Sequence, residues 1–366
     1  MVLWFYITIL ILSSICCIIY YWKMRNYFSV HYTLVFILAF LSHLCYVLLA
    51  LSKDIREAII INKFLYVGGC YFELVGLVLI FSLCKINIPK SIRFILALYS
   101  TFIFGCVMTV GYLPVFYKSV DITEKNGVTV LIKEYGPLHS MFYIMVLIYL
   151  VATIFALVYG WFKNPNVSRT NLVIAAFMQI FTIFSYICGR AISKDIEWVA
   201  LADLVNEIGF LIIMDRIGLY RVDDMVSSSI LKEGHVGYIS LDFKKRYLSA
   251  TDAAKHYLPE IAKNRADKII ASDELRELFD SWIDDFNKEN VSKTHIYRRN
   301  GFIYSIHVAN LYDGKRKRGY LLVISDDTAH QQHLEGIERI NKNLNNELIV
   351  KTKLIHDLQK QQKTAE

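Results

Sequence analysis

Several side chains that can hold a ligand or a proton lie inside long apolar stretches of this sequence. Asp203 and Glu207 are four residues apart, and Phe210 and Met214 follow at i+7 and i+11 from Asp203. This spacing puts both carboxylates on one helical face, which we expect to point into a helix bundle. Carboxylates and amides at that depth suit a cation, a proton or a polar metabolite equally well. The candidate ligand-binding residues are His43, Glu73, Gln179, Arg190, Asp203, Asn206 and Glu207.

Two interpretations of these polar residues stay open. They could surround a shared cavity, with Arg190 pairing with one of the carboxylates, or they could only join helices through polar contacts worth about 1 kcal/mol each. Two other chemistries are disfavoured. The last apolar stretch has no lysine for a retinal Schiff base, and the histidines of the apolar stretches lack the spacing of a zinc or serine hydrolase site.

The composition indicates how these residues are positioned. The chain has 366 residues, of which 55% are hydrophobic, and a mean hydropathy of +0.38, which is typical of a membrane protein. A membrane helix needs about 20 apolar residues. Seven stretches qualify, at residues 3–22, 30–51, 59–84, 92–112, 137–162, 170–190 and 197–219.

The predicted fold class is therefore a membrane all-α bundle of seven spans within residues 1–222, followed by a small α+β domain and a C-terminal coiled-coil helix. Residues 223–366 hold 23 basic and 22 acidic residues, so this part is an ordinary water-facing domain. It has no basic stripe, and we expect no nucleic-acid partner. All seven cysteines lie in apolar stretches, so no disulfide framework or metal cluster is predicted.

The short loops give a direction in the membrane. Loops after spans 1, 3 and 5 carry seven basic residues and no acid, whereas the other loops carry seven basic residues matched by seven acids over a greater length. Basic density favours a multi-pass protein of the cell membrane with its N-terminus outside and its C-terminus in the cytoplasm. The longest outer loop, residues 113–136, contains two strand-like runs around Asn126-Gly127, which predicts a β-hairpin. It could be a lid on the bundle or contact a ligand directly.

After Tyr220 the periodicity changes. Strands are predicted at 236–241 and 247–250, a short helix capped by Thr251, an amphipathic helix over 272–290 beginning at Ser272, and three further strands at 295–299, 302–311 and 319–325. The predicted turns between the last three strands are Asn300-Gly301 and Asp313-Gly314. This order, closed by Asp326-Asp327-Thr328, resembles a PAS domain over residues 230–328. It contains no cysteine for a flavin adduct, and its histidines (His256, His295 and His307) more often occupy surface or core positions than ligate haem. We expect no cofactor.

Residues 329–366 follow a heptad pattern, which predicts a parallel homodimer. The predicted interface residues are Leu334, Ile337, Asn341, Leu344, Leu348, Ile355 and Leu358, with Lys351 as the other d position. His356 could be a phosphoacceptor, but it is more readily a solvated histidine beside the seam.

Seven spans, the outer hairpin running into the segment Tyr135 to His139, Asp203 in the last span, the PAS-like domain and the coiled coil together resemble the 7TM sensor region of bacterial histidine kinases. The same sensor heads many receptors with cyclic-di-GMP output domains. The resemblance implies a membrane sensor that passes ligand-driven helix motion through the PAS-like domain to the coiled coil.

No ATP-binding domain follows the last helix, so we expect no catalysis by this chain and an output or kinase protein as a partner, besides the lipid bilayer and an unknown small ligand. The alternative is a small membrane transporter that uses the polar cluster as its translocation path. A transporter predicts broken helices and an internal repeat.

Overall fold

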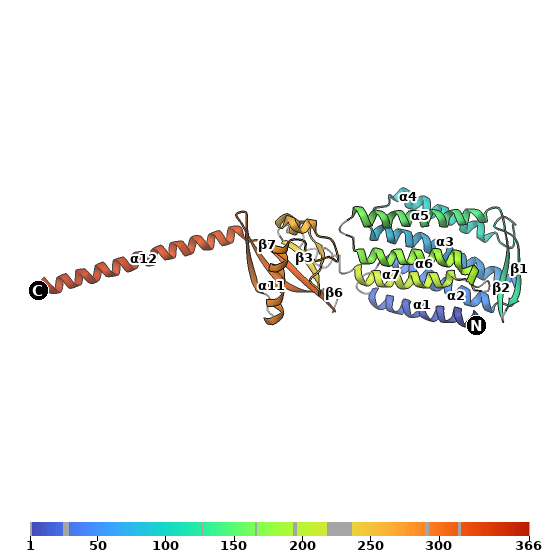
Figure 1. The fold of residues 1–366 in the computed structure, drawn as a ribbon, viewed down its shortest axis with the longest axis horizontal. Helices are drawn as coiled ribbons and strands as arrows, with labels where there is room; N and C mark the ends of the chain where they lie inside the picture. Colours follow the sequence, from blue (N-terminus) through green and yellow to red (C-terminus); the bar gives the residue numbers. More distant parts are fainter. Residues whose placement is uncertain are drawn as a thin grey trace.

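A computed structural model of the chain describes residues 2–24, 29–125, 127–164, 167–192, 196–217, 236–289, 293–313 and 316–365. The molecule is elongated (Figure 1). A bundle of helices carries a β-hairpin at one end, a sheet-rich domain lies beyond the other end, and one long helix extends away from that domain. The N-terminus lies at the hairpin end of the bundle.

The bundle consists of helices that run roughly parallel to one axis. Their bounds are α1 Val2–Met24, α2 Val30–Leu51, α3 Ile55–Leu83, α4 Lys90–Met108, α5 His139–Lys163, α6 Arg169–Ile192 and α7 Val199–Ile217. Six of them, α1 to α6, are long and apolar enough to cross a membrane. Helix α7 is not among these six, and it carries Asp203, Glu207, Asp215 and Arg216. The chain is therefore a multi-pass membrane protein.

The bundle core is apolar, and so is its outer surface. Phe36, Ile80, Met178 and Ile213 are almost fully buried where α2, α3, α6 and α7 meet. Large apolar side chains are also exposed on the outside, for example Phe94 of α4. Helices satisfy their own backbone hydrogen bonds, so an apolar exterior of this kind is suited to lipid.

The predicted outer hairpin is present. Strand β1, Tyr117–Lys125, pairs antiparallel with β2, Val128–Tyr135, and Gly127 has a φ of 74° in the turn. Asn126, the other half of the predicted turn, lies outside the described residues. Val128 packs on the ends of α1, α2 and α7, and the Thr129 hydroxyl donates to the carbonyl oxygen of Ser52 at 2.5 Å. These contacts fix the hairpin over one end of the bundle.

The sheet-rich domain has five antiparallel strands in the order β4-β3-β7-β6-β5. Their bounds are β3 Val236–Asp242, β4 Tyr247–Ala250, β5 Thr294–Arg299, β6 Phe302–Asp313 and β7 Arg316–Asp326. Between β4 and β5 lie α10 (Asp252–Tyr257), a 3-10 turn η2 (Pro259–Lys263) and α11 (Asp273–Glu289).

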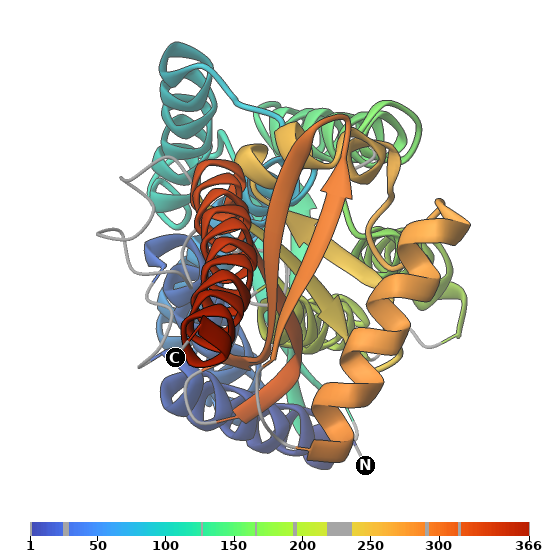
Figure 2. The same ribbon diagram turned by 90° about the vertical axis from the view of Figure 1, so that its left-hand side faces the viewer.

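These elements follow the local signals of the sequence. The Thr251 hydroxyl accepts a hydrogen bond from the Ala254 N–H and so caps α10. The apolar face of α11, which includes Phe279 and Ile283, packs on the sheet and closes the core of this domain (Figure 2). Asn300 and Gly301 have φ values of 48° and 81°, as expected for a tight hairpin turn. Part of the second predicted turn, Gly314, lies outside the described residues.

Helix α12, Thr328–Ala365, begins directly after β7. The Ile303 N–H donates to the Thr328 hydroxyl at 2.9 Å, and the Thr328 N–H donates to the Asp326 carboxylate at 3.0 Å. An ion pair of 2.9 Å between Arg298 and Glu335 also joins α12 to β5. The first turns of α12 are therefore held by the sheet.

Most of α12 extends away from the sheet-rich domain (Figure 1). Four of the predicted interface residues are exposed, namely Leu334, Ile337, Leu344 and Leu348. Asn341 is also exposed. The side chains of Ile355 and Leu358, like that of His356, lie outside the described part.

Candidate ligand cavity and the junction with the sheet-rich domain

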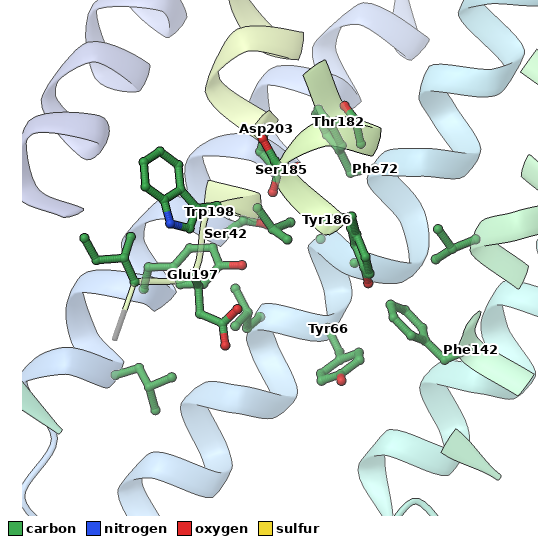
Figure 3. Close-up of a pocket in the computed structure, with 18 of the residues that line it drawn as sticks. Ser42, Tyr66, Phe72, Phe142, Thr182, Ser185, Tyr186, Glu197, Trp198 and Asp203 are labelled. Carbon is green, nitrogen blue, oxygen red and sulfur yellow. The ribbon is translucent and has the colours of Figure 1, made fainter. Parts of the chain in front are cut away.

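A cavity of about 610 Å³ lies at the hairpin end of the bundle (Figure 3). This volume is in the range of pockets that hold small molecules. Its walls come from α1, α2, α3, α5, α6 and α7, and strand β2 covers it with residues from Val128 to Tyr135. The hairpin therefore lines the cavity as well as covering it.

Three of the predicted site residues line this cavity. Glu73 comes from α3, Gln179 from α6 and Asp203 from α7. Each side chain is partly exposed although it lies within the bundle, because part of it faces the cavity. Within the described part of the chain, no hydrogen bond or ion pair holds the carboxylate of Glu73 or of Asp203. Two of the three acids of the lining, Glu73 and Asp203, are thus among the candidate residues from the sequence, and Glu197 is not.

Asn206, Glu207 and His43 do not line the cavity, which corrects the prediction of one shared site. Asn206 donates to the Thr182 hydroxyl at 3.1 Å and so joins α7 to α6. Its position corresponds to a polar contact between helices rather than to ligand binding.

Glu207 and His43 form a second, closed cluster. Both side chains have an exposed fraction of 0%, and His43 Nδ1 lies 3.9 Å from Glu207 Oε2. The Cys17 thiol donates to Glu207 Oε1 at 3.7 Å, and His43 Nε2 lies 3.1 Å from the carbonyl oxygen of Ala200. Asp203 and Glu207 face different surroundings, because Glu207 contacts Cys17 of α1 and His43 of α2, whereas Asp203 lines the cavity. Arg190 belongs to α6, but its side chain lies outside the described part.

Most of the cavity lining was not predicted from the sequence. Many of these residues are aromatic, including Tyr6, Tyr46, Tyr66, Phe72, Tyr117, Phe142, Tyr186 and Trp198. Tyr6 stacks on Tyr46 with ring centroids 5.5 Å apart, and the Tyr66 and Tyr117 hydroxyls are 2.7 Å apart. Aromatic residues are so frequent in the spans that no sequence signal separates the lining rings from packing rings.

Two polar atoms of the lining are also unsatisfied. Ser185 Oγ and Trp198 Nε1 are buried without a hydrogen-bond partner in the described structure, and Ser185 has an exposed fraction of 4%. In the view of Figure 3, Ser185 lies close to Asp203, and the rings of Trp198 and Tyr186 lie on either side of them. Buried polar groups normally have partners, so unsatisfied atoms on residues that line a cavity indicate a place for a polar ligand group.

The opposite end of the bundle carries a polar junction that the sequence analysis did not identify. Asp215 of α7 accepts from Lys23 of α1 at 2.8 Å and from Arg318 of β7 at 2.7 Å. Its carboxylate therefore connects two helices of the bundle to the sheet.

A second set of contacts lies beside it. Arg216 donates to Asn171 of α6 at 2.8 Å and pairs with Asp267 at 3.3 Å. The Ser168 hydroxyl donates to Asp267 at 2.5 Å. The sequence signal that could have indicated this junction is the charged pair Asp215-Arg216 at the end of the last apolar stretch.

The histidines of the sheet-rich domain have separate surroundings. His295 stacks on Trp282 with centroids 5.1 Å apart, and burial lowers its pKa. His307 Nδ1 lies 3.4 Å from the Thr294 hydroxyl, and His256 lies on α10. Across the described residues, no group of three or more His, Cys, Asp or Glu side chains could hold a metal ion.

The bundle of membrane-length helices, its cavity and the attached sheet-rich domain define a multi-pass membrane protein of the sensor type. Residues 6–220 match the family described as the N-terminal 7TM region of histidine kinase. The match covers more than half of the chain, so the protein belongs to this family. The family resemblance inferred from the sequence is thereby confirmed. No curated protein is significantly similar to the chain.

Proposed function

We propose that this protein is a transmembrane receptor in which a small ligand in the cavity shifts the helix bundle, and in which the shift reaches α12 through the sheet-rich domain. The output is a catalytic unit of the histidine kinase or cyclic-di-GMP type, in the same protein or in a partner. A ligand can drive such a change only by binding two bundle states with different affinities.

The observation that carries this proposal is the placement of α7. Asp203 near its start lines the cavity, whereas Asp215 and Arg216 near its end contact the sheet-rich domain. Twelve residues of helix span about 18 Å. A movement of α7 as a rigid element would therefore displace Arg318 and Asp267 together with it. In this proposal α7 is a seventh membrane span, and its charged groups face the cavity or other parts of the protein.

The sheet-rich domain is the proposed relay. Its order of two strands, helices and three strands supports the PAS-like assignment. Strand β7 carries Arg318 at one end and leads into α12 at the other, and Thr328 is hydrogen-bonded to β6. A displacement at Arg318 therefore has a short covalent path to α12.

The proposed readout is a parallel dimer of α12. The exposed apolar seam of Leu334, Ile337, Leu344 and Leu348 supports this arrangement, with Asn341 setting the register. A short coiled coil is marginal alone, and confinement of both chains in the membrane raises their effective concentration.

Cysteine crosslinking in membranes tests the relay. On a background with the native cysteines removed, Leu344→Cys should crosslink efficiently, and Asn346→Cys on the solvent side should not. Asp203→Asn should then change the crosslinking rate at position 344, whereas Glu124→Gln, an exposed acid of the hairpin, should not. If the Asp203→Asn protein crosslinks at position 344 at the same rate as the parent protein, the relay is contradicted. Efficient crosslinking only at 346 would mean that the heptad is assigned in the wrong frame.

The proposed orientation places the hairpin and the cavity outside the cell and the sheet-rich domain in the cytoplasm. Two single cysteines, Glu124→Cys in β1 and Lys288→Cys in α11, test it in intact cells. A membrane-impermeant maleimide should label position 124 before lysis and position 288 only after lysis. The reverse pattern would overturn the orientation.

A transporter is the second candidate, and continuous helices α1 to α7 argue against it because transporters commonly break helices at the binding site. Solute flux into proteoliposomes that Asp203→Asn abolishes would replace the sensor proposal.

A further inference from the structure

We propose that the cavity binds a small organic cation, specifically an amine with an apolar body. This inference rests on the proposed sensing function and adds the chemical class of the ligand.

Charge is the first observation. The described lining contains three acids, Glu73, Asp203 and Glu197, one lysine, Lys133, and one histidine, His139. The Lys133 ammonium lies over the Tyr117 ring, 5.8 Å from its centroid, at the hairpin. Carboxylates at membrane depth are costly unless a positive group faces them. Since no described ion pair reaches Glu73 or Asp203, a cationic ligand would supply that charge, whereas an anion would be repelled.

The walls around these acids provide the second observation. Tyr46, Phe72, Tyr186 and Trp198 line the same cavity. Aromatic faces attract organic cations and contribute more when the site excludes water. The same rings also bury the apolar body of a ligand, which a bare proton or metal ion lacks. The cavity of about 610 Å³ is far larger than an ion, and no three-residue metal cluster occurs among the described residues.

A third observation comes from Ser185. This residue lines the cavity and is 4% exposed, and its buried hydroxyl oxygen has no hydrogen-bond partner in the described structure. An ammonium group has several N–H donors, so one can be accepted by a carboxylate and another by this hydroxyl. The geometry therefore favours an amine with free N–H groups over a fully substituted ammonium ion.

The test compares three probes of similar size and different charge with the full chain in lipid nanodiscs. The cation is 2-phenylethylammonium, the neutral probe is 2-phenylethanol and the anion is 3-phenylpropanoate. We expect the cation to bind at least tenfold more tightly than either of the other two in titration calorimetry. Asp203→Asn and Glu73→Gln should each weaken cation binding at least tenfold while changing 2-phenylethanol binding less than twofold. The matched control Glu124→Gln should leave all three affinities unchanged.

Folding of each variant is checked by its thermal unfolding, and 2-phenylethanol binding reports whether the cavity is intact. The inference is overturned if the neutral or anionic probe binds as tightly as the cation, if none of the probes binds, or if Asp203→Asn, with an intact cavity, retains the full cation affinity. The sensing function is judged separately, by α12 crosslinking at position 344. Probe binding that shifts this crosslinking without charge preference would preserve the sensor and reject the amine. Cation binding without any shift would preserve the amine and reject the sensor.

Discussion

The two ends of the helix bundle use polar residues in opposite ways. At the hairpin end, Asp203 and Glu73 face an open cavity with aromatic walls, and no described ion pair holds them. At the other end, Asp215 is held by both Lys23 and Arg318, and Arg216 is held by Asn171 and Asp267. One helix, α7, contributes to both ends.

This difference indicates a division of roles. Unsatisfied groups can gain a partner when a ligand enters, so the hairpin end can distinguish two bundle states. Satisfied groups that cross from one domain to another transmit displacement, because breaking them leaves charges without partners. The comparison predicts that substitutions at the cavity change ligand affinity, whereas substitutions at the junction separate ligand binding from the behaviour of α12.

The largest effect is expected at Gly319, next to Arg318 in β7. A Cβ added there would lie 2.1 Å from the carbonyl oxygen of Leu241, so strands β3 and β7 would have to separate locally. Gly319→Ala should lower the free energy of unfolding by about 2 to 3 kcal/mol, as overpacking does. Calorimetric or denaturant unfolding of the full chain measures it.

Gly105→Ala is the control, because an added Cβ at this α4 position meets no atom within 4 Å. It should be neutral or slightly stabilising. Equal losses of stability in the two variants would show that the close contact between β3 and β7 is not what determines the effect.

The second effect is expected at Asp215, whose side chain is 28% exposed. Asp215→Asn removes the charge that Lys23 and Arg318 share, and should lower the free energy of unfolding by about 1 to 2 kcal/mol. Binding of 2-phenylethylammonium should stay within about twofold, a difference of under ~0.5 kcal/mol. In the Asp215→Asn protein, bound 2-phenylethylammonium should no longer change the rate of crosslinking at position 344.

Asp252→Asn provides the control, because Asp252 pairs with Lys255 at 2.8 Å on an exposed surface. Its crosslinking response should match that of the parent protein. If Asp215→Asn keeps the full response, the signal does not pass through this junction, and the contrast between the two ends loses its functional meaning.

The sequence predicted the fold well where a local signal determines structure. Apolar length gave the helices to within a few residues at most ends, Asn300-Gly301 gave the β5-β6 turn, and Thr251 gave the cap of α10. Such features depend on a few neighbouring residues. The seven-span count remains a prediction, since α7 carries four charged residues and only α1 to α6 are clearly apolar enough to cross.

The candidate site could be predicted only in part. The acids at 73 and 203 are identifiable because charge is rare inside apolar stretches. Their separation from Glu207 depends on which helices cover each turn of α7, and helical spacing does not contain that information. The junction was missed for a related reason, because Asp267 and Arg318 lie more than 50 residues from their partners on α7.

The smallest effect is expected at an ion pair that should play no part in the relay. Glu260 in η2 pairs with both terminal nitrogens of Arg299 at the end of β5, and the Arg299 guanidinium lowers the pKa of Glu260 below its ordinary value of 4.5. A carboxyl group with a lowered pKa in the folded state stabilises the fold above the ordinary value, and this contribution is lost as the pH falls through the lowered value. Glu260→Gln should therefore lower the free energy of unfolding by under ~1 kcal/mol at about pH 7, as for other partly exposed pairs, and by nearly nothing at about pH 3.

Unfolding of the parent protein and of the Glu260→Gln protein at the two pH values measures this difference, and crosslinking at position 344 should keep its full response. A Glu260→Gln protein that loses the response would place the relay along η2 and β5 rather than along β7, and the two ends of α7 would no longer suffice to explain signalling.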